Sequence, residues 1–306
     1  MKTEGKWCGV FARMVSVLVV FSGLAAHAAP EPTLADVPYG AHPKQVLDFY
    51  KAETAQPAPV MFFIHGGSWL SGDKKTRIAN LQECLNAGIS VVSIEYRFIS
   101  EATADGLVPP VKGPLQDAAR ALQFVRSKAA EWNVDKTRIA AAGNSAGGCS
   151  ALWLALHDDL ADADSADPVA RESSRPCAAA GLAAQTSLDP QQMRAWIPNI
   201  LYGGHAFGFR NFEEFLAGRE KILPWIAEYS PYALITAGDP PIFLQYSDVP
   251  ALGQEQKSGP HGSNLGVEFT AKCRSLGIEC EFIYPGATEV KYKALMQFLT
   301  AKLKSP

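Results

Sequence analysis

Short apolar segments alternate with longer helical segments along most of this chain, and that alternation constrains its fold more than any other feature. Such a pattern predicts a mostly parallel sheet covered by helices on both faces. In sheets of this kind, catalytic residues gather at the carboxyl ends of the strands. The expected strands are residues 60–65, 90–96, 138–143, 178–186, 242–247 and 280–284, and the expected helices include 77–87, 115–132 and 146–157.

Length and charge narrow the class of protein further. The chain has 306 residues, of which 47% are hydrophobic, so it can bury one large core as a single domain. Its formal net charge is −3, and its Lys and Arg residues form no dense run. Nucleic acid is therefore not an expected partner.

The first thirty residues differ in composition from the rest. Basic residues precede an apolar run at 14–21, and Ala26-His27-Ala28 follows it; the basic residues are Lys2, Lys6 and Arg13. This pattern is typical of a secretory signal peptide over residues 1–28, with cleavage after Ala28, although an uncleaved anchor stays possible. No later stretch reaches the roughly 20 apolar residues of a membrane helix. We therefore expect a secreted or periplasmic protein with no stable membrane span after signal removal.

The cysteines fit an exported protein without a metal centre. Six are present, and Cys8 would leave with the signal peptide. Cys273 and Cys280 lie close together across an expected helix-to-strand turn and are the pair that spacing favours for a disulfide. Cys149 is expected as a small core residue. None of the cysteines has the spacing of zinc ligands, so no metal is expected.

The segment Gly143-Asn144-Ser145-Ala146-Gly147 matches the pattern GxSxG. It follows an expected strand and opens an expected helix, where a tight turn holds the serine in a strained conformation with its hydroxyl exposed. Side chains at the flanking glycines would collide with the neighbouring strand and helix. An ordinary glycine-rich turn is the alternative. We predict that Ser145 is a catalytic nucleophile.

A second glycine segment, His65-Gly66-Gly67-Ser68-Trp69, directly follows the first expected strand. Small residues there let backbone N–H groups face a developing oxyanion, and the residue after the nucleophile supplies another amide. The expected oxyanion hole therefore consists of the amides of Gly66, Gly67 and Ala146. We expect the ring of His65 to orient this loop.

The two segments together resemble the esterase and lipase branch of the α/β-hydrolase fold, near hormone-sensitive-lipase-like and feruloyl-esterase-like secreted enzymes. The resemblance covers about residues 45–155, and further matches are Tyr96-Arg97, Asp117 and Asp135-Lys136-Thr137-Arg138-Ile139. It implies an α/β-hydrolase domain over residues 29–306, with a small lid segment at about 187–235. It also implies hydrolysis of small-molecule or carbohydrate-linked carboxylic esters through an acyl-enzyme on serine, without a cofactor.

The sequence departs from this family at the catalytic base, which the family places just after the last strand. Here that strand ends in Tyr284-Pro285-Gly286, and no histidine follows. Among the six histidines, His27 leaves with the signal peptide, His42 precedes the first expected strand, and His65 is placed in the oxyanion loop. His157 is twelve residues along a helix from Ser145, about 18 Å away, which is too far for proton transfer.

Two histidines remain as candidates for the base. His261 lies in the loop after the expected strand 242–247, at the catalytic edge of the sheet, and is favoured; His205 lies in the expected lid and stays open. For the acid, Asp248 directly follows the same strand and is favoured, with Asp189 as the alternative. Loss of the base would instead leave a non-catalytic binding protein with the same fold, and that second function also stays open.

Overall fold

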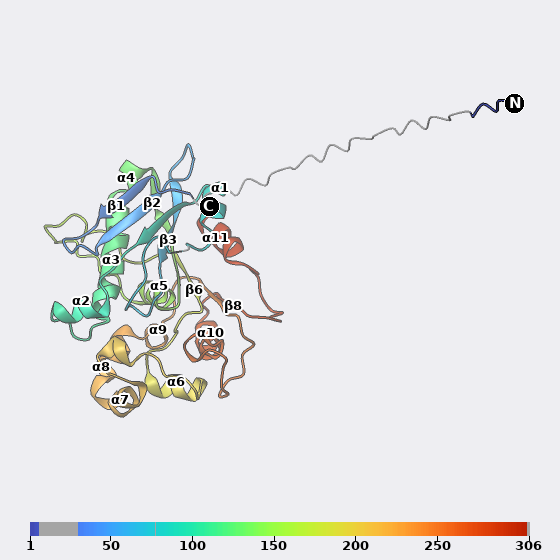
Figure 1. The fold of residues 1–306 in the computed structure, drawn as a ribbon. Helices are drawn as coiled ribbons and strands as arrows, with labels where there is room; N and C mark the ends of the chain where they lie inside the picture. Colours follow the sequence, from blue (N-terminus) through green and yellow to red (C-terminus); the bar gives the residue numbers. More distant parts are fainter. Residues whose placement is uncertain (6–29, 77, 305–306) are drawn as a thin grey trace.

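An eight-stranded sheet forms the centre of the computed structural model, which describes residues 1–5, 30–76 and 78–304 (Figure 1). The strand order is β1-β2-β4-β3-β5-β6-β7-β8, and the neighbours from β4 to β8 run parallel. The strands are β1 (Leu34–Pro38), β2 (Val46–Tyr50), β3 (Ala58–Ile64), β4 (Ser90–Ile94), β5 (Val134–Asn144), β6 (Ala178–Leu182), β7 (Ile242–Gln245) and β8 (Cys280–Ile283). The mostly parallel sheet expected from the sequence is confirmed.

Helices cover both faces of this sheet and fill the segment between β6 and β7 (Figure 1). The α-helices are α1 (Leu81–Asn86), α2 (Ile99–Ala104), α3 (Lys112–Ser127), α4 (Ala129–Trp132), α5 (Ala146–Leu156), α6 (Pro190–Trp196), α7 (Phe212–Ala217), α8 (Leu223–Tyr229), α9 (Pro231–Leu234), α10 (Asn264–Ser275) and α11 (Leu295–Lys304). Three short 3-10 helices are η1 (Gly204–Phe207), η2 (Arg219–Ile222) and η3 (Gly259–His261).

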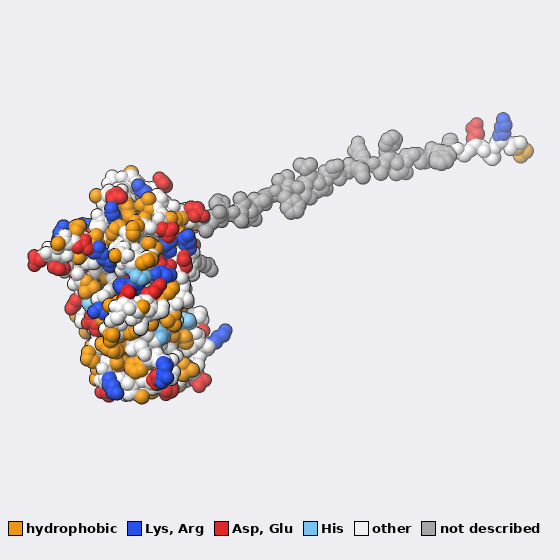
Figure 2. All heavy atoms as spheres, turned by 60° about the vertical axis from the view of Figure 1, so that its left-hand side comes forward, with side chains coloured by type: hydrophobic (Ala, Val, Ile, Leu, Met, Phe, Trp, Pro, Cys, Tyr) orange, Lys and Arg blue, Asp and Glu red, His pale blue; other side chains and the backbone are white. Residues whose placement is uncertain are grey.

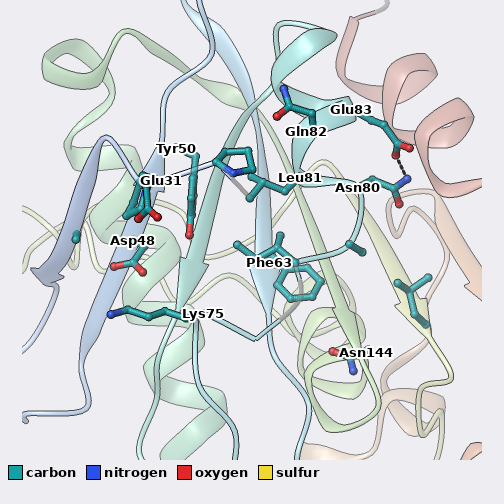
Figure 3. A pocket seen from close by; sticks show the side chains of 16 residues that line it. Glu31, Asp48, Tyr50, Phe63, Lys75, Asn80, Leu81, Gln82, Glu83 and Asn144 are labelled. Carbon is teal, nitrogen blue, oxygen red and sulfur yellow. Dashed lines mark hydrogen bonds between the residues drawn. The ribbon is translucent and has the colours of Figure 1, made fainter. Parts of the chain in front are cut away.

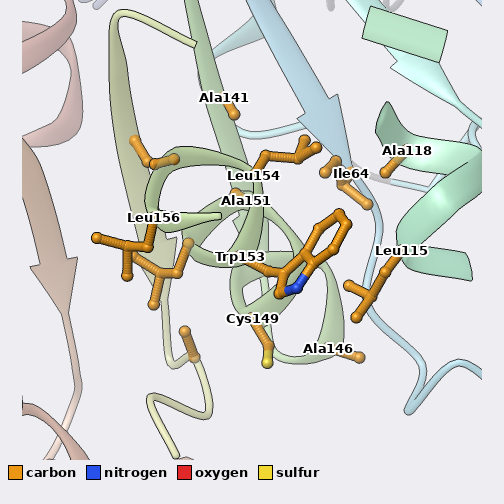
Figure 4. Close-up of a cluster of buried hydrophobic side chains, with 14 of the residues drawn as sticks. Ile64, Leu115, Ala118, Ala141, Ala146, Cys149, Ala151, Trp153, Leu154 and Leu156 are labelled. Atoms are coloured by element: carbon orange, nitrogen blue, oxygen red, sulfur yellow. The ribbon is translucent and has the colours of Figure 1, made fainter. Parts of the chain in front are cut away.

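Alternate side chains of the central strand β3 pack into two separate apolar cores. Phe62 and Ile64 join the core under α3 and α5, whereas Met61 and Phe63 join the core under α1 and α11. This period of two is that of a strand buried on both faces. Helix α5 is buried at every residue because it lies between the sheet and α3, and Figure 4 shows its Trp153 beside Leu115 of α3.

The segment between β6 and β7 contains α6 to α9, which lie together at one end of the molecule, away from α1 and α11 (Figure 1). It includes residues 187–235, the expected lid segment. The preceding strand was expected to reach residue 186 but ends at Leu182. Ala183 has a left-handed backbone with φ 49°, which turns the chain out of the sheet.

The remaining expectations from the sequence concern the signal peptide, the cysteines, membrane helices and metal sites. All but the first five residues of the expected signal peptide lie outside the described residues. The five described cysteines, including Cys273 and Cys280, are free thiols, so the structure does not contain the expected disulfide. Cys149 is fully buried in the core, as expected. Within the described ranges, no helix is long and apolar enough to span a bilayer, and no cluster of His, Cys, Asp or Glu could hold a metal ion.

Candidate active site

Ser145 occupies a strained turn between β5 and α5. Its backbone has φ 52° and ψ −124°, a conformation that residues other than glycine rarely adopt. Neighbouring backbone holds it there, because the Ser145 amide donates to the carbonyl of Leu182 at 2.8 Å. A Cβ on Gly147 would lie 2.1 Å from the Ile64 carbonyl oxygen, and one on Gly143 would lie 2.4 Å from that of Gly147. The GxSxG pattern therefore forms the strained turn that the sequence predicted.

The ring of His261 contacts the hydroxyl of Ser145. The distance between Ser145 Oγ and His261 Nε2 is 2.9 Å, within hydrogen-bond range. His261 ends η3 in the loop between β7 and α10, residues 246–263, which we call the base loop. Its ring is half-buried, and burial lowers its pKa. The neutral, proton-accepting form of this imidazole is therefore favoured at neutral pH.

The other ring nitrogen of His261 faces a hydroxyl and not a carboxylate. Ser258 Oγ lies 3.2 Å from His261 Nδ1. Asp248, the favoured acid, is half-buried and has no hydrogen bond to His261 in the part of the chain that the structure describes. The alternative acid, Asp189, has other partners. It caps α6 and accepts two hydrogen bonds from Arg219, at 2.8 and 2.7 Å. The structure thus brings neither aspartate to the base.

Sequence reasoning missed Ser258 because it searched only for carboxylates. Ser258 precedes His261 by three residues, and the His261 amide donates to the Ser258 carbonyl at 3.2 Å, which closes a tight turn. Gly259 and Pro260 form that turn, and Gly-Pro pairs are strong turn formers. The sequence therefore indicated the turn that places Ser258 near His261, although it did not show which way the serine side chain would point.

The second candidate base, His205, supports the oxyanion loop. Its Nε2 lies 3.0 Å from the backbone carbonyl of Ser68, and its ring packs against Trp69 and Tyr202. His65, expected to orient the same loop, is fully buried. Its Nδ1 lies 2.7 Å from the Gly66 carbonyl, and its ring stacks on Tyr96 with 4.4 Å between centroids. Both rings therefore hold backbone of the oxyanion loop in place.

The oxyanion loop has a left-handed backbone over three consecutive residues. The φ angles are 109° at Gly67, 59° at Ser68 and 55° at Trp69. A Cβ on Gly67 would lie 2.0 Å from the carbonyl oxygen of Ser71, so only glycine fits there. This backbone turns the chain at the carboxyl end of β3, next to the turn that carries Ser145.

One of the three expected oxyanion donors is already paired. The Gly66 amide donates to the side-chain oxygen of Asn144 at 3.1 Å, which ties the oxyanion loop to the serine turn. Gly67 and Ala146 remain as the expected donors. Ala146 is the first residue of α5, so its N–H has no acceptor within the helix. In this structure the Gly66 amide thus anchors the oxyanion loop to the serine turn.

The surface beside the serine turn is hollowed on the side of α1. A cavity of about 820 Å³ extends from Asn144 and Phe63 to Tyr50 and Glu31 (Figure 3). A second cavity of about 380 Å³ shares Asn80, Asn144 and Leu182 with the first and continues to the ends of β6 and β7. On the face shown in Figure 2, acidic and basic side chains are interspersed.

Solved structures share this architecture. A truncated carbohydrate esterase from gut microbiota superposes with a TM-score of 0.65 at 20% identity, over 89% of this chain and 96% of that chain. The acetyl ester-xyloside bifunctional hydrolase from Caldicellulosiruptor lactoaceticus gives a TM-score of 0.60 at 21% identity, over 84% and 83%. The fold is the α/β-hydrolase fold expected from the sequence.

Curated relatives and a family model match the same region. Carboxylesterase NlhH of Mycobacterium tuberculosis is 37% identical over 105 residues, which are 33% of this chain and 30% of the relative. A probable isoprenylcysteine alpha-carbonyl methylesterase of Arabidopsis thaliana is 29% identical over 138 residues, 45% of this chain and 28% of the relative. The matched region spans less than a third of either relative. The BD-FAE family model matches residues 47–258, more than half of the chain. The chain belongs to the BD-FAE family of α/β-hydrolase-fold proteins.

Proposed function

We propose that this protein hydrolyses carboxylic esters through an acyl-enzyme formed on Ser145. The observation that carries the proposal is the 2.9 Å contact between Ser145 Oγ and His261 Nε2. A serine hydroxyl becomes a nucleophile when a neighbouring base can accept its proton, and a neutral imidazole is such a base. The non-catalytic alternative depended on loss of the base, and His261 supplies one from another loop.

The reaction begins with proton transfer from Ser145 Oγ to His261 Nε2 while the oxygen attacks the ester carbonyl carbon. The amides of Gly67 and Ala146 hold the negative charge that develops on the carbonyl oxygen. His261 then gives the proton to the leaving alkoxide oxygen, and the ester C–O bond breaks. In the second half, His261 takes a proton from water, the water oxygen attacks the acyl carbon, and the carboxylic acid leaves as Ser145 regains its proton.

For the substrate we propose a small-molecule or carbohydrate-linked ester. Two cavities that share Asn80, Asn144 and Leu182 border the residue that precedes the nucleophile, although neither is lined by Ser145 or His261. Their lining includes the uncharged amides of Asn80, Asn144 and Gln245, which can donate and accept hydrogen bonds. Two structural relatives are described as a carbohydrate esterase and as an acetyl ester-xyloside hydrolase, which supports the carbohydrate-linked class.

We also propose that the protein is exported to the periplasm or the medium. Basic residues, the apolar run at 14–21 and Ala26-His27-Ala28 support removal of residues 1–28. Sequencing of the exported protein should find Ala29 at its amino terminus, and a protein that retains Met1 would overturn the cleavage.

The catalytic role of His261 can be tested against His205 with a short p-nitrophenyl ester. His261→Ala should lower kcat by a factor of about a thousand or more, because the base is lost. His205→Ala removes a hydrogen bond to the Ser68 carbonyl and should lower kcat by about tenfold or less. Activity of the unchanged enzyme should fall as pH drops through a value below about 6.5, because burial lowers the pKa of His261. The reverse ranking of the two variants would move the base to the lid.

A further inference from the structure

Both ring nitrogens of His261 have a hydroxyl partner. Nε2 lies 2.9 Å from Ser145 Oγ, and Nδ1 lies 3.2 Å from Ser258 Oγ. In related serine hydrolases the second partner is a carboxylate. We propose that Ser258 is the positioning residue of this site and that its uncharged hydroxyl takes the place of that carboxylate. This inference rests on the proposed function, because it assigns Ser258 a role in the same reaction.

Unlike a carboxylate, the Ser258 hydroxyl can either accept a hydrogen bond from Nδ1–H or donate one to Nδ1. When Nδ1–H donates to Ser258 Oγ, the lone pair of Nε2 is left free to accept the proton of Ser145. The hydroxyl carries no charge, however, so it does not stabilise the imidazolium as a carboxylate does. Ser258 therefore orients the base and leaves its basicity to the surroundings.

Those surroundings contain no charge in contact with the ring. In the parts of the chain that the structure describes, no carboxylate or cation forms a hydrogen bond or ion pair with His261, and burial alone lowers its pKa. Of the charged residues in the base loop, Glu255 and Lys257 are exposed and Asp248 is half-buried. On the lid side, Asp189 is paired with Arg219, and Glu213 is paired with Arg194.

Hydrogen bonds to the rest of the molecule hold the base loop so that Ser258 can reach the ring. Gln256 exchanges two backbone hydrogen bonds with the side chain of Asn199, at 2.9 and 3.1 Å. The buried Gln185 donates to the Pro260 carbonyl, one residue before the base. Ser258 and His261 are thus parts of one anchored turn, and Ser258 needs no further movement to contact Nδ1.

Kinetics of three Ser258 variants test this role. Ser258→Ala should lower kcat about tenfold with KM within about twofold, the scale of losing one neutral hydrogen bond. Ser258→Thr keeps the hydroxyl and should keep most of the rate. Ser258→Asp places a carboxylate beside Nδ1, raises the pKa of His261 and should move the acid limb of the pH profile up by about one unit or more. Lys257 is an exposed neighbour of Ser258, and Lys257→Ala is the control. It should change neither kcat nor the acid limb of the pH profile.

A measurement that does not depend on activity separates failure of this inference from failure of the proposed function. Nitrogen NMR of ¹⁵N-histidine-labelled protein should show His261 with Nδ1 protonated in the unchanged protein and in Ser258→Thr. Ser258→Ala should show a mixture of the two tautomers. An unchanged tautomer in Ser258→Ala overturns the inference even if the protein hydrolyses no ester, and an unchanged kcat in Ser258→Ala overturns it in an active enzyme.

Discussion

The two halves of the candidate site are held in different ways. The serine turn and the oxyanion loop are held by backbone, because Ser145 and Gly67 have positive φ angles and adjoin the ends of β5 and β3. The base loop is held by side-chain hydrogen bonds, some of which reach distant parts of the sequence. Asn264, fully buried at the start of α10, donates to the carbonyls of Trp196 and Ala251 at 2.8 and 2.7 Å. Backbone geometry therefore fixes the nucleophile, and long-range hydrogen bonds fix the base.

Disruption of the serine turn or the oxyanion loop, the half held by backbone, should have the larger effect on catalysis. Gly67→Val places a Cβ where the Ser71 carbonyl lies and forces a branched residue into a left-handed backbone, so the loop must shift its donor amide. We expect kcat to fall roughly a hundredfold, the scale of losing one oxyanion donor. Steady-state kinetics on p-nitrophenyl acetate measure it. The control is Gly106→Ala, because Gly106 also has a positive φ but has open space around it. An equal loss of kcat in both variants would contradict the assignment of Gly67 as an oxyanion donor.

Disruption of the contacts that hold the base loop should affect the stability of the protein as well as kcat. Asn264→Ala removes the side-chain donor to the carbonyls of Trp196 and Ala251, which keep their backbone donors. It also removes the side-chain oxygen that accepts from the Ala251 amide. We expect the free energy of unfolding to fall by about 2–3 kcal/mol and kcat to fall several-fold, because the hydrogen bonds of a buried side chain are lost, the Ala251 amide loses its acceptor and the base loop loosens. Chemical denaturation monitored by tryptophan fluorescence measures the first. The exposed Asn86→Ala is the control, and equal stability of the two variants would show that the loop is held by other contacts.

The same difference between the two halves of the site explains which of its features could be predicted from the sequence. The strained turn at Ser145 and the supporting role of His65 were predictable because each depends on neighbours in the chain and on the strand that precedes it. The pairing of Gly66 with Asn144 was not, since it joins residues 78 positions apart. Ser258 was also missed, because a carboxylate was expected there and because the direction of the Ser258 side chain depends on how the base loop is anchored to the lid. Strand β1 was missed because it is a largely exposed edge strand without a clear apolar pattern. Strand β2 was also missed, although four of its five residues are buried.

The smallest effect should come from the residue that the sequence favoured as the acid. Asp248→Asn should leave kcat and KM within about twofold, because Ser258, and not Asp248, is the partner of His261 Nδ1. The pH profile of the variant should match that of the unchanged enzyme. A loss of a hundredfold or more would instead return the orienting role to Asp248 and require the base loop to rearrange during catalysis.

The central claim is that His261 activates Ser145 as a nucleophile, and reaction with an active-site-directed fluorophosphonate tests it most directly. The purified protein should gain a single adduct, and peptide mapping by mass spectrometry should place it on Ser145. Ser145→Ala should gain none, and His261→Ala should react at least a hundredfold more slowly, because the proton of the Ser145 hydroxyl then has no acceptor. Absence of an adduct, or an adduct on another serine, would contradict the claim.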